Sequence, residues 1–369
     1  MIILNIAELS NKKFVGPNIN VPANVLYGEK SAITGLYNTG NESLDNVKEL
    51  KYYFRKEQMQ KNDVSTLPEP FNKPDLVVFN SMYIIKHVKI ARKLIKRGIP
   101  YIIIPRGALT RKAQQKKWYK KKIANLVIFK NYIKNATAIH FLTEMEYEES
   151  KKFKIKQHII SGNGTITKKT EKKKENKEKF VITFIGRIDR YHKGLDTLLE
   201  AINLGKEKIR SYCIEFKIYG PNYDNSIEYL KNKINEYKIN DIVMINGPVY
   251  DKEKEEILIN SDLFIHTSRL EGHPTSIIEA ISYGIPVLVT PGTNMAGEVK
   301  KYNLGFVAEL NAQSIENTII DAYKNRNNFF EISNNEINYS KENFAWEIVM
   351  KRTINNYKNI LLKYHREEK

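Results

Sequence analysis

The stretch DLFIHTSRLEGHPTSIIEAISYGIPVLVT, residues 262–290, contains an apolar run, a tight turn, an amphipathic segment and a second apolar run in succession. The flanking runs DLFIHTS and PVLVT have the length and composition of buried strands. Between them a helix is expected to begin near Thr275, and Gly284 and Pro286 end it. A strand, a helix and a second strand in this order predict one repeat of a parallel α/β sheet.

The same alternation runs through most of the chain. Further strands are predicted at residues 75–80, 101–105, 138–143, 180–186, 213–220, 241–247 and 305–310. Helical patterns separate them, including two basic helices at about 85–98 and 111–135, and the last helical stretches fall at about 312–327 and 341–364. The pattern predicts the α/β class, with two Rossmann-like doubly wound domains that face each other across a cleft holding the ligand.

The alternation breaks once, at a Lys/Glu run without an apolar face. We therefore expect a first domain over residues 1–165, a charged linker over 166–179 and a second domain over 180–340. Residues 341–369 are expected to form a C-terminal helix that could pack back on the first domain.

Composition excludes several protein classes. The 369 residues include a single cysteine, which rules out an intrachain disulfide framework and cysteine-rich metal clusters and fits a reducing compartment. No apolar run approaches the roughly 20 residues of a membrane helix, and the N-terminus lacks the features of a signal peptide. The expected location is the cytoplasm.

The net charge of +18 is unevenly distributed. The window Lys86–Lys134 holds sixteen Lys and Arg and no Asp or Glu, whereas the chain outside this window and the linker is close to neutral. A lysine-rich composition explains part of the excess, but such a window also favours an anionic partner, either nucleic acid or a membrane surface.

The chain has no Walker A loop, no GxGxxG, no HExxH, no CxxC and no Asp-x-Asp pair. These absences leave P-loop hydrolysis, dinucleotide binding and standard zinc sites without support. No cofactor is expected, and no metal, since a diphosphate held through a divalent cation needs carboxylates of the missing kind.

Two cations follow the predicted strand at 180–186. In FIGRIDRYHKG, Arg187 comes directly after the strand and Lys193 lies at the start of a helix. The planar fork of an arginine, the point charge of a lysine and a helix N-terminus could together hold a diphosphate without a metal. The alternative is a pair of surface cations near a helix start.

The turn after Glu271 presents backbone amides. Gly272, His273 and Pro274 form this turn, and the amides of Gly272, His273, Thr275 and Ser276 are expected to serve as anion donors. His273 is either a hydrogen-bond donor or simply exposed. Glu279 has a competing role, because Ser276 and Glu279 have the spacing of a capping box.

The elements FIGR…KG, IYGP and the pair Glu271 and Glu279 within EGHPTSIIEAISYGIPVLVT occur in one order and spacing. They resemble the retaining family-4 glycosyltransferases of the GT-B fold. The resemblance implies that Arg187 and Lys193 bind the donor diphosphate, that Glu271 contacts the transferred sugar and that Glu279 contacts the ribose. It also implies that the amides of residues 272–275 hold the sugar and phosphate.

The resemblance continues into the first half. The Gly16 loop looks like a one-glycine form of the family's N-terminal Gly-Gly loop on the donor side. The run IPRGALTRKAQQKKWYKKK, residues 104–122, is similar to the acceptor-side segment of bacterial polysaccharide and lipopolysaccharide glycosyltransferases. Arg106, which stands where some relatives have a histidine, and Arg111 are the acceptor-side candidates, and residues 296–298 would line the next donor loop.

The family implies transfer of a sugar, with retention, from a nucleoside diphosphate sugar to a cell-surface glycan of capsule or lipopolysaccharide type or to a lipid-linked acceptor. A UDP-sugar is the expected donor and a GDP-sugar the second choice. Since the first domain presents the acceptor in this fold, the basic window predicts docking on the anionic inner face of the cytoplasmic membrane.

Two other readings stay open. A sugar-phosphate synthase or a phosphorylase of the same fold would use the same donor residues. A nucleic-acid-binding protein could use residues 86–134, but the window lacks the repeated aromatic platforms of single-strand binders. No nucleic-acid partner is expected.

Overall fold

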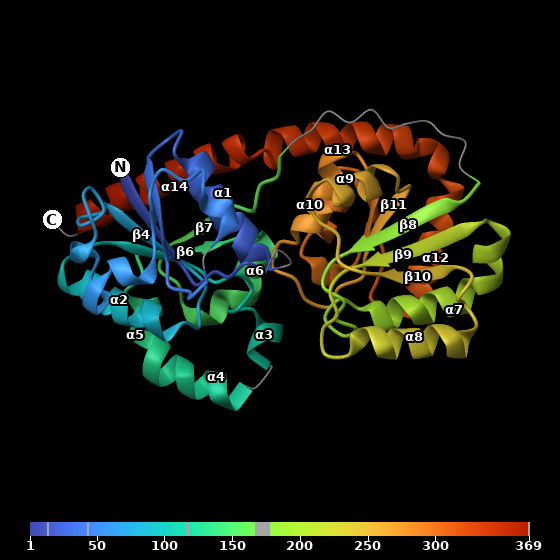
Figure 1. Ribbon diagram of the computed structural model, residues 1–369, viewed down its shortest axis with the longest axis horizontal. Coiled ribbons are helices and arrows are strands. Elements are labelled where there is room, and N and C mark those ends of the chain that lie inside the picture. The colour runs from blue at the N-terminus through green and yellow to red at the C-terminus, as the bar shows by residue number, and fades with distance from the viewer. Residues whose placement is uncertain (13–14, 43, 116–117, 167–177, 368–369) are drawn as a thin grey trace. The chain divides into compact units, whose positions relative to one another are not determined.

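A computed structural model describes residues 1–12, 15–42, 44–115, 118–166 and 178–367. The chain forms two compact units, Met1–Asn163 together with Trp346–Lys369, and Gly164–Ala345. Each unit is built around a parallel β-sheet with helices on both faces, which confirms the predicted fold class (Figure 1). Most of the predicted linker, residues 167–177, lies outside the described residues.

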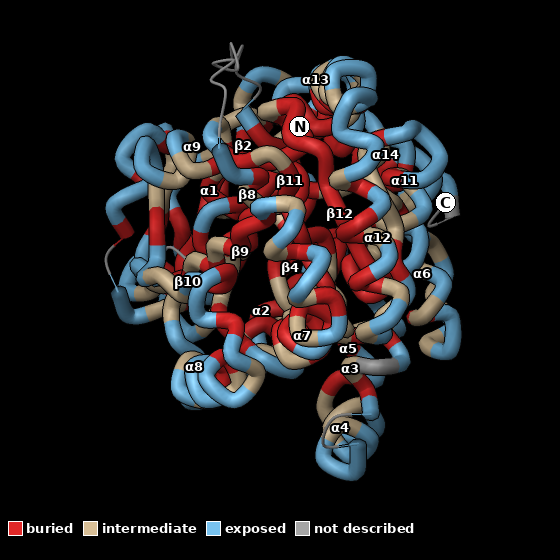
Figure 2. The backbone as a smooth tube through the Cα atoms, turned by 90° about the vertical axis from the view of Figure 1, so that its right-hand side faces the viewer, coloured by how far each residue is buried: buried red, intermediate tan, exposed pale blue. Residues whose placement is uncertain are grey.

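The first unit contains seven parallel strands in the order β3-β2-β1-β4-β5-β6-β7. Their bounds are β1 (Ile2–Ala7), β2 (Ile33–Asn38), β3 (Tyr53–Phe54), β4 (Leu76–Asn80), β5 (Tyr101–Ile104), β6 (Ala138–Phe141) and β7 (His158–Ile160). The central strands are almost entirely buried, as continuous apolar runs such as LVVFN require (Figure 2).

Apolar side chains cover both faces of this sheet. On one face, α14 (Trp346–Glu367) places Met350 and Ile354 against Ile3 and Ile102, and α1 (Gly16–Gly28) lies beside it. On the other face, α2 (Ile85–Lys96) and α5 (Lys130–Lys134) contact the apolar residues of β4 and β5. The remaining helices are α3 (Arg111–Gln115), α4 (Trp118–Ala124), a π-helix (Asn125–Phe129) and α6 (Glu144–Ser150).

The second unit repeats this topology with six parallel strands in the order β10-β9-β8-β11-β12-β13. Their bounds are β8 (Phe180–Ile185), β9 (Ile214–Tyr219), β10 (Val243–Asn246), β11 (Leu263–His266), β12 (Val287–Val289) and β13 (Gly305–Val307). The chain moves outward from β8 to β10, then returns to add β11 on the opposite side of β8. The strand order therefore reverses between β8 and β11, where ligands bind in open α/β sheets.

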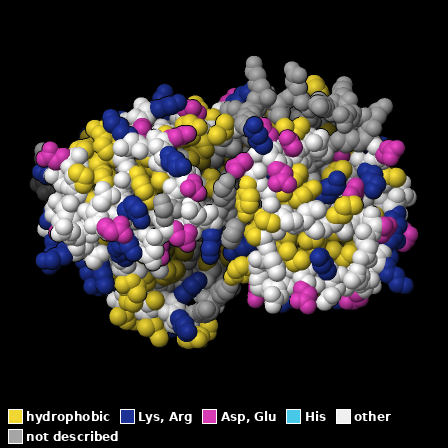
Figure 3. Space-filling view, viewed as in Figure 1, with side chains coloured by type: hydrophobic (Ala, Val, Ile, Leu, Met, Phe, Trp, Pro, Cys, Tyr) yellow, Lys and Arg dark blue, Asp and Glu magenta, His cyan; other side chains and the backbone are white. Residues whose placement is uncertain are grey.

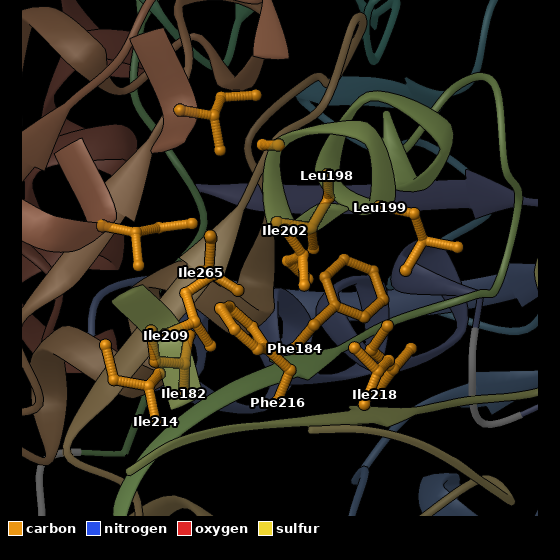
Figure 4. Packing of buried hydrophobic residues seen from close by; sticks show 14 of the residues in the cluster. Ile182, Phe184, Leu198, Leu199, Ile202, Ile209, Ile214, Phe216, Ile218 and Ile265 are labelled. Atoms are coloured by element: carbon orange, nitrogen blue, oxygen red, sulfur yellow. The ribbon is translucent and has the colours of Figure 1, made fainter. Parts of the chain in front are cut away.

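Two apolar clusters hold helices to the faces of the second sheet. Phe184 of β8 and Phe216 of β9 point into a cluster with Leu198 and Ile202 of α7 (Figure 4). The opposite face packs Ile185, Phe264 and Val287 against α9, α10 and α11. The helix bounds are α7 (Leu195–Ser211), α8 (Ser226–Tyr237), α9 (Asp251–Ile259), α10 (Thr275–Ser282), α11 (Ala296–Lys301), α12 (Ala312–Lys324) and α13 (Phe329–Asn343).

The predicted helix at 111–135 is confirmed in its described residues, which are helical from Arg111 to Gln115 and from Trp118 to Lys134, with π-helical hydrogen bonding at Asn125–Phe129. The prediction for the end of the chain was wrong in detail. The segment before the C-terminal helix forms a separate helix, α13, and α14 begins only at Trp346. Ile332 of α13 is buried, so this helix is stabilised by packing despite its largely polar sequence.

No helix of the described residues is both long and apolar enough to cross a bilayer.

A glycine fixes the start of α7. Gly194 precedes the helix with a φ of 62°, and an added Cβ would lie 2.0 Å from the carbonyl oxygen of Thr267. Thr267 in turn donates its hydroxyl to the carbonyl of Gly194 at 3.1 Å. The absence of a side chain thus allows the N-terminus of α7 to approach the end of β11.

We expect Gly194→Ala to destabilise the protein more than Gly98→Ala. Gly98 has a φ of 63° but no neighbour within 4 Å of an added Cβ, so its substitution costs only the left-handed conformation, about 1–2 kcal/mol. At Gly194 the backbone must also move. Urea unfolding of the two variants measures the difference, and equal losses would contradict the close approach.

Candidate functional site

A charged pair lies at the reversal of the strand order in the second unit. Lys193, at the end of the loop after β8, extends its side chain past Gly186, whose added Cβ would lie 3.9 Å from Lys193 Cε. Lys193 Nζ donates to Oε1 of Glu271, which follows β11. Because β8 and β11 are parallel neighbours, their carboxyl ends bring together two residues 78 positions apart in the chain.

The carboxylate of Glu271 has a second partner. Ser268 Oγ donates to Glu271 Oε1 at 2.9 Å and lies 2.9 Å from Nδ1 of the fully buried His266. Burial raises the pKa of Glu271, but the charge and hydrogen bond of Lys193, with help from Ser268, more than offset it and leave the pKa below its usual value. Burial lowers the pKa of His266 to about 3. At neutral pH the site therefore holds an ionised carboxylate, a lysine cation and a neutral imidazole.

Arg187 is held by its neighbours directly after β8. Its guanidinium stacks on the ring of Tyr223, 4.2 Å from the centroid, and donates to Asp189 Oδ2 at 3.2 Å. Asp189 is buried and also accepts from the backbone amide of His192. These contacts limit the freedom of Arg187 while its side chain stays 37% exposed, so it can still meet a ligand.

The turn between Glu271 and α10 is held by hydrogen bonds to Gly292 and Asn294, in the segment after β12. The amide of Glu271 donates to the carbonyl of Gly292 at 2.8 Å, and Asn294 Nδ2 donates to the carbonyl of Gly272 at 3.2 Å. The helix begins at Thr275 with Pro274 as its N-cap, and no side chain caps this end. Its first turn therefore offers backbone N–H groups to an anion.

The reading of His273 as an exposed loop residue was wrong. The residue is only 7% exposed, its ring lies 5.9 Å from that of Phe344, and burial lowers its pKa to about 4. A neutral imidazole at this point of the turn is able to donate one hydrogen bond, and carries no charge at neutral pH.

The alternative role of Glu279 as part of a capping box was also wrong. Because Pro274 is the N-cap, Ser276 lies inside the helix and Glu279 lies two positions beyond N3. Glu279 instead forms an ion pair with Lys254 of α9, and both side chains are about one fifth exposed. The carboxylate of Glu279 therefore pairs with a side chain of another helix and does not cap the start of α10.

The other candidates lie in the first unit. Gly16 is the first residue of α1, and an added Cβ would meet only Asn20 Nδ2, at 3.7 Å. Arg106 is half-buried, has a φ of 52° and donates to Asn80 Oδ1 at 2.9 Å. Burial lowers the pKa of Arg106 to about 10. Arg111 is exposed at the start of α3. The donor candidates apart from Gly16 therefore share one unit, and the acceptor candidates share the other.

Several residues of the site were missed in the sequence. Ser268, Lys254, Tyr223 and Asn294 contact the predicted residues, yet each is a common polar or aromatic type in a loop or on a helix. The position of Ser268 at the end of the strand predicted at 262–268 was the one signal available. Within the described residues no cluster of three or more His, Cys, Asp or Glu side chains has the arrangement of a metal site.

This fold and site define a class of protein, a doubly wound α/β protein with a charged site at a reversal of strand order. Residues 165–343, a little under half of the chain, match the family Glycosyl transferases group 1, so the chain carries a domain of that family.

One curated relative and two solved structures are similar to this chain. Protein CapJ from Staphylococcus aureus is 27% identical over 237 residues, which cover 63% of this chain and 58% of CapJ, so the match spans little more than half of that relative. Among solved structures, sucrose-phosphate synthase from Thermosynechococcus elongatus superposes with a TM-score of 0.75 at 14% identity, over 98% of this chain and 100% of the other. HepE from Anabaena, in complex with UDP and glucose, superposes with a TM-score of 0.73 at 13% identity, over 97% of this chain and 99% of the other. At these identities the structural likeness concerns the fold.

We expect the stability lost in Lys193→Met to depend on pH. Without Lys193 the buried Glu271 keeps a raised pKa, because burial is no longer offset by the cation. In the unaltered protein the lowered pKa of Glu271 stabilises the folded state at pH values above about 4.5, the pKa of this group in the unfolded chain. That stabilisation is lost as the pH falls through the lower pKa of the folded state. The deficit of the variant should therefore be about 1–3 kcal/mol at pH 7 and shrink towards pH 4.

Melting temperatures across this pH range measure the effect. Lys193→Arg, which keeps the charge, serves as the control and should show the smaller deficit. A deficit of Lys193→Met that does not change with pH would contradict the charge pairing.

Proposed function

We propose that the protein is a glycosyltransferase that takes a sugar from a nucleoside diphosphate sugar. The observation that carries this proposal is the Lys193–Glu271 pair beside Arg187, at the strand-order reversal of a group 1 glycosyl transferase domain. Two cations suit a diphosphate, and an ionised carboxylate suits sugar hydroxyls. This arrangement requires no metal, so the proposed reaction is metal-independent.

The charges of the site fit the departure of a nucleoside diphosphate. Negative charge grows on the diphosphate as the bond to the sugar breaks, while the sugar becomes positively charged. Arg187 and Lys193 stabilise the former, and the amides at the start of α10 add to this field. Glu271, hydrogen-bonded to Ser268, accepts from the sugar and stabilises its positive charge.

Glu279 takes the ribose hydroxyls in this proposal. Its carboxylate lies on α10 one turn beyond the helix start and forms an ion pair with Lys254, and about one fifth of its side chain is exposed. UDP is the preferred nucleotide because the HepE structure of similar fold contains UDP, with GDP second. Retention of configuration rests on the resemblance to family-4 enzymes, in which the leaving phosphate takes the proton of the acceptor.

The acceptor is proposed to be a cell-surface glycan or its lipid-linked precursor. The support is the acceptor-side segment with Arg106 and Arg111, which resembles that of bacterial polysaccharide and lipopolysaccharide glycosyltransferases. A sugar-phosphate acceptor is the second candidate, since the sucrose-phosphate synthase has a similar fold. Radiolabelled transfer to a sugar phosphate or to lipid extracts separates the two.

We expect Arg187→Ala and Lys193→Ala each to lower kcat/KM by about 10²–10³, since one lost donor to a developing oxyanion has an effect of this size. Turnover of the donor, including its slow hydrolysis, is the measurement. Lys231→Met, an exposed cation on α8, is the matched control and should leave the rate unchanged. Near-normal turnover in both alanine variants would contradict the diphosphate role.

We expect a UDP-sugar to raise the melting temperature. A ligand present at 100 times its Kd adds about 2.7 kcal/mol of stability. Thermal shifts with UDP, GDP, ADP and CMP derivatives identify the base, and Glu279→Gln should weaken the shift without lowering the melting temperature of the free protein by much. The absence of a shift with every nucleotide would contradict the proposed donor.

A further inference from the structure

The exposed apolar side chains of the first unit are concentrated on α4 and the π-helix that follows it. Trp118 is 61% exposed, Leu126 66% and Val127 72%, while Phe129 at the end of the π-helix is buried. Scattered exposed apolar residues are common, but a continuous row on one helical segment marks an interaction surface. We name as the α4 face the exposed residues Trp118, Tyr119, Lys122, Ile123, Leu126, Val127 and Lys130.

The spacing of these residues places them on one side of the segment. Trp118, Lys122 and Leu126 are four positions apart, as are Tyr119, Ile123 and Val127, so both rows run along the helix axis. The segment projects from the body of its unit, and the space-filling view shows apolar and basic side chains side by side there (Figures 2 and 3). The lysines thus lie within and beside the apolar rows.

The structure also divides the acid-free window. Lys93 of α2 and Arg97, the C-cap of this helix, share Asp63 as ion-pair partner, at 3.5 and 3.1 Å, so part of their charge is compensated. Arg106 is half-buried against Asn80. The cations of α4 instead lie next to aromatic rings, with Lys122 Nζ 6.0 Å from the ring centroid of Trp118. The described part of the window in which cations adjoin exposed apolar side chains is therefore residues 118–134.

A groove of about 560 Å³ adjoins this face. Its lining includes the cations Arg111, Lys122, Lys130 and Lys152, together with Trp118 and Phe153. Burial lowers the pKa of Lys152, and the nearby charge of Arg111 lowers it further. Cations brought this close in a groove with apolar walls are suited to a phosphate that carries an acyl chain.

We propose that the α4 face binds the surface of an anionic phospholipid bilayer, with the apolar rows inserted at the interface and headgroup phosphates on the cations of the groove. Trp and Tyr are the side chains typical of the membrane interface, and lysines extend their stems across apolar surface while keeping the ammonium group among the headgroups. This proposal does not depend on the sugar transfer proposed above.

Sedimentation with phospholipid vesicles at low salt tests the proposal in the intact protein. The protein should sediment with phosphatidylcholine vesicles that contain phosphatidylglycerol and not with phosphatidylcholine alone. The triple variant Lys122→Glu, Lys130→Glu, Lys152→Glu, which reverses three cations of the groove, should bind about 10²-fold more weakly, since each cation at such a surface contributes roughly fivefold. Equal sedimentation with both kinds of vesicle, or with neither, would overturn the proposal.

A matched variant separates this face from net charge. Lys89→Glu, Arg92→Glu, Lys96→Glu makes the same change of charge on exposed residues of α2, within the same window. Its vesicle binding should fall much less than that of the groove variant. Equal losses in the two triple variants would overturn the assignment to α4.

Excess pyrophosphate should leave the protein on the vesicles, and full release would show that the groove takes free phosphate instead.

Fluorescence reports the insertion directly, because the chain has two tryptophans and Trp346 is only 5% exposed. Emission should shift to shorter wavelength with anionic vesicles, and Trp118→Phe should remove the shift while preserving sedimentation. Ile123→Ser with Leu126→Ser should weaken binding at moderate salt, where the apolar part remains. A single-stranded RNA bound more tightly than the vesicles, and lost in the groove variant, would overturn the proposal in favour of nucleic acid.

Discussion

The ion pair of Lys193 with Glu271 joins the loops that follow β8 and β11, the two neighbouring strands between which the strand order of the second sheet reverses. Neither side chain is much exposed, at 14% and 15%, so bulk water screens the attraction between the two charges only weakly. The partners arrive from β8 and β11, which are adjacent only because the chain returns past β8 after forming β9 and β10. The site is therefore a product of topology.

The surroundings of the pair serve to keep it in place. Gly194 lets α7 begin against the end of β11, and Ser268 shares the carboxylate oxygen with the lysine. Asn294 and Gly292 hold the turn before α10 through backbone contacts. These supports have a common consequence: the cation, the carboxylate and the helix amides are fixed before a ligand arrives, which reduces the ordering that binding would otherwise require.

Charge is used differently in the two units. In the second unit, Lys193, Lys254 and Arg187 each meet a carboxylate, and the cations remain within reach of a small anion. In the first unit, α2 compensates part of its charge with Asp63, whereas α4 carries cations beside exposed apolar side chains. The former arrangement suits a compact phosphate ligand, and the latter suits an extended anionic surface.

The sequence by itself determined the fold class, the strands from residue 75 onward except β7, and the strand-end positions of Arg187 and Glu271, because apolar period and strand-end position are local properties. It did not determine that Glu279 pairs with Lys254, that His273 is buried, or that α13 is a helix, since these depend on what packs against each residue. Nor did it show which cations of the window are paired. Only the tertiary structure decides such contacts, because they join residues far apart in the chain whose types do not specify a partner.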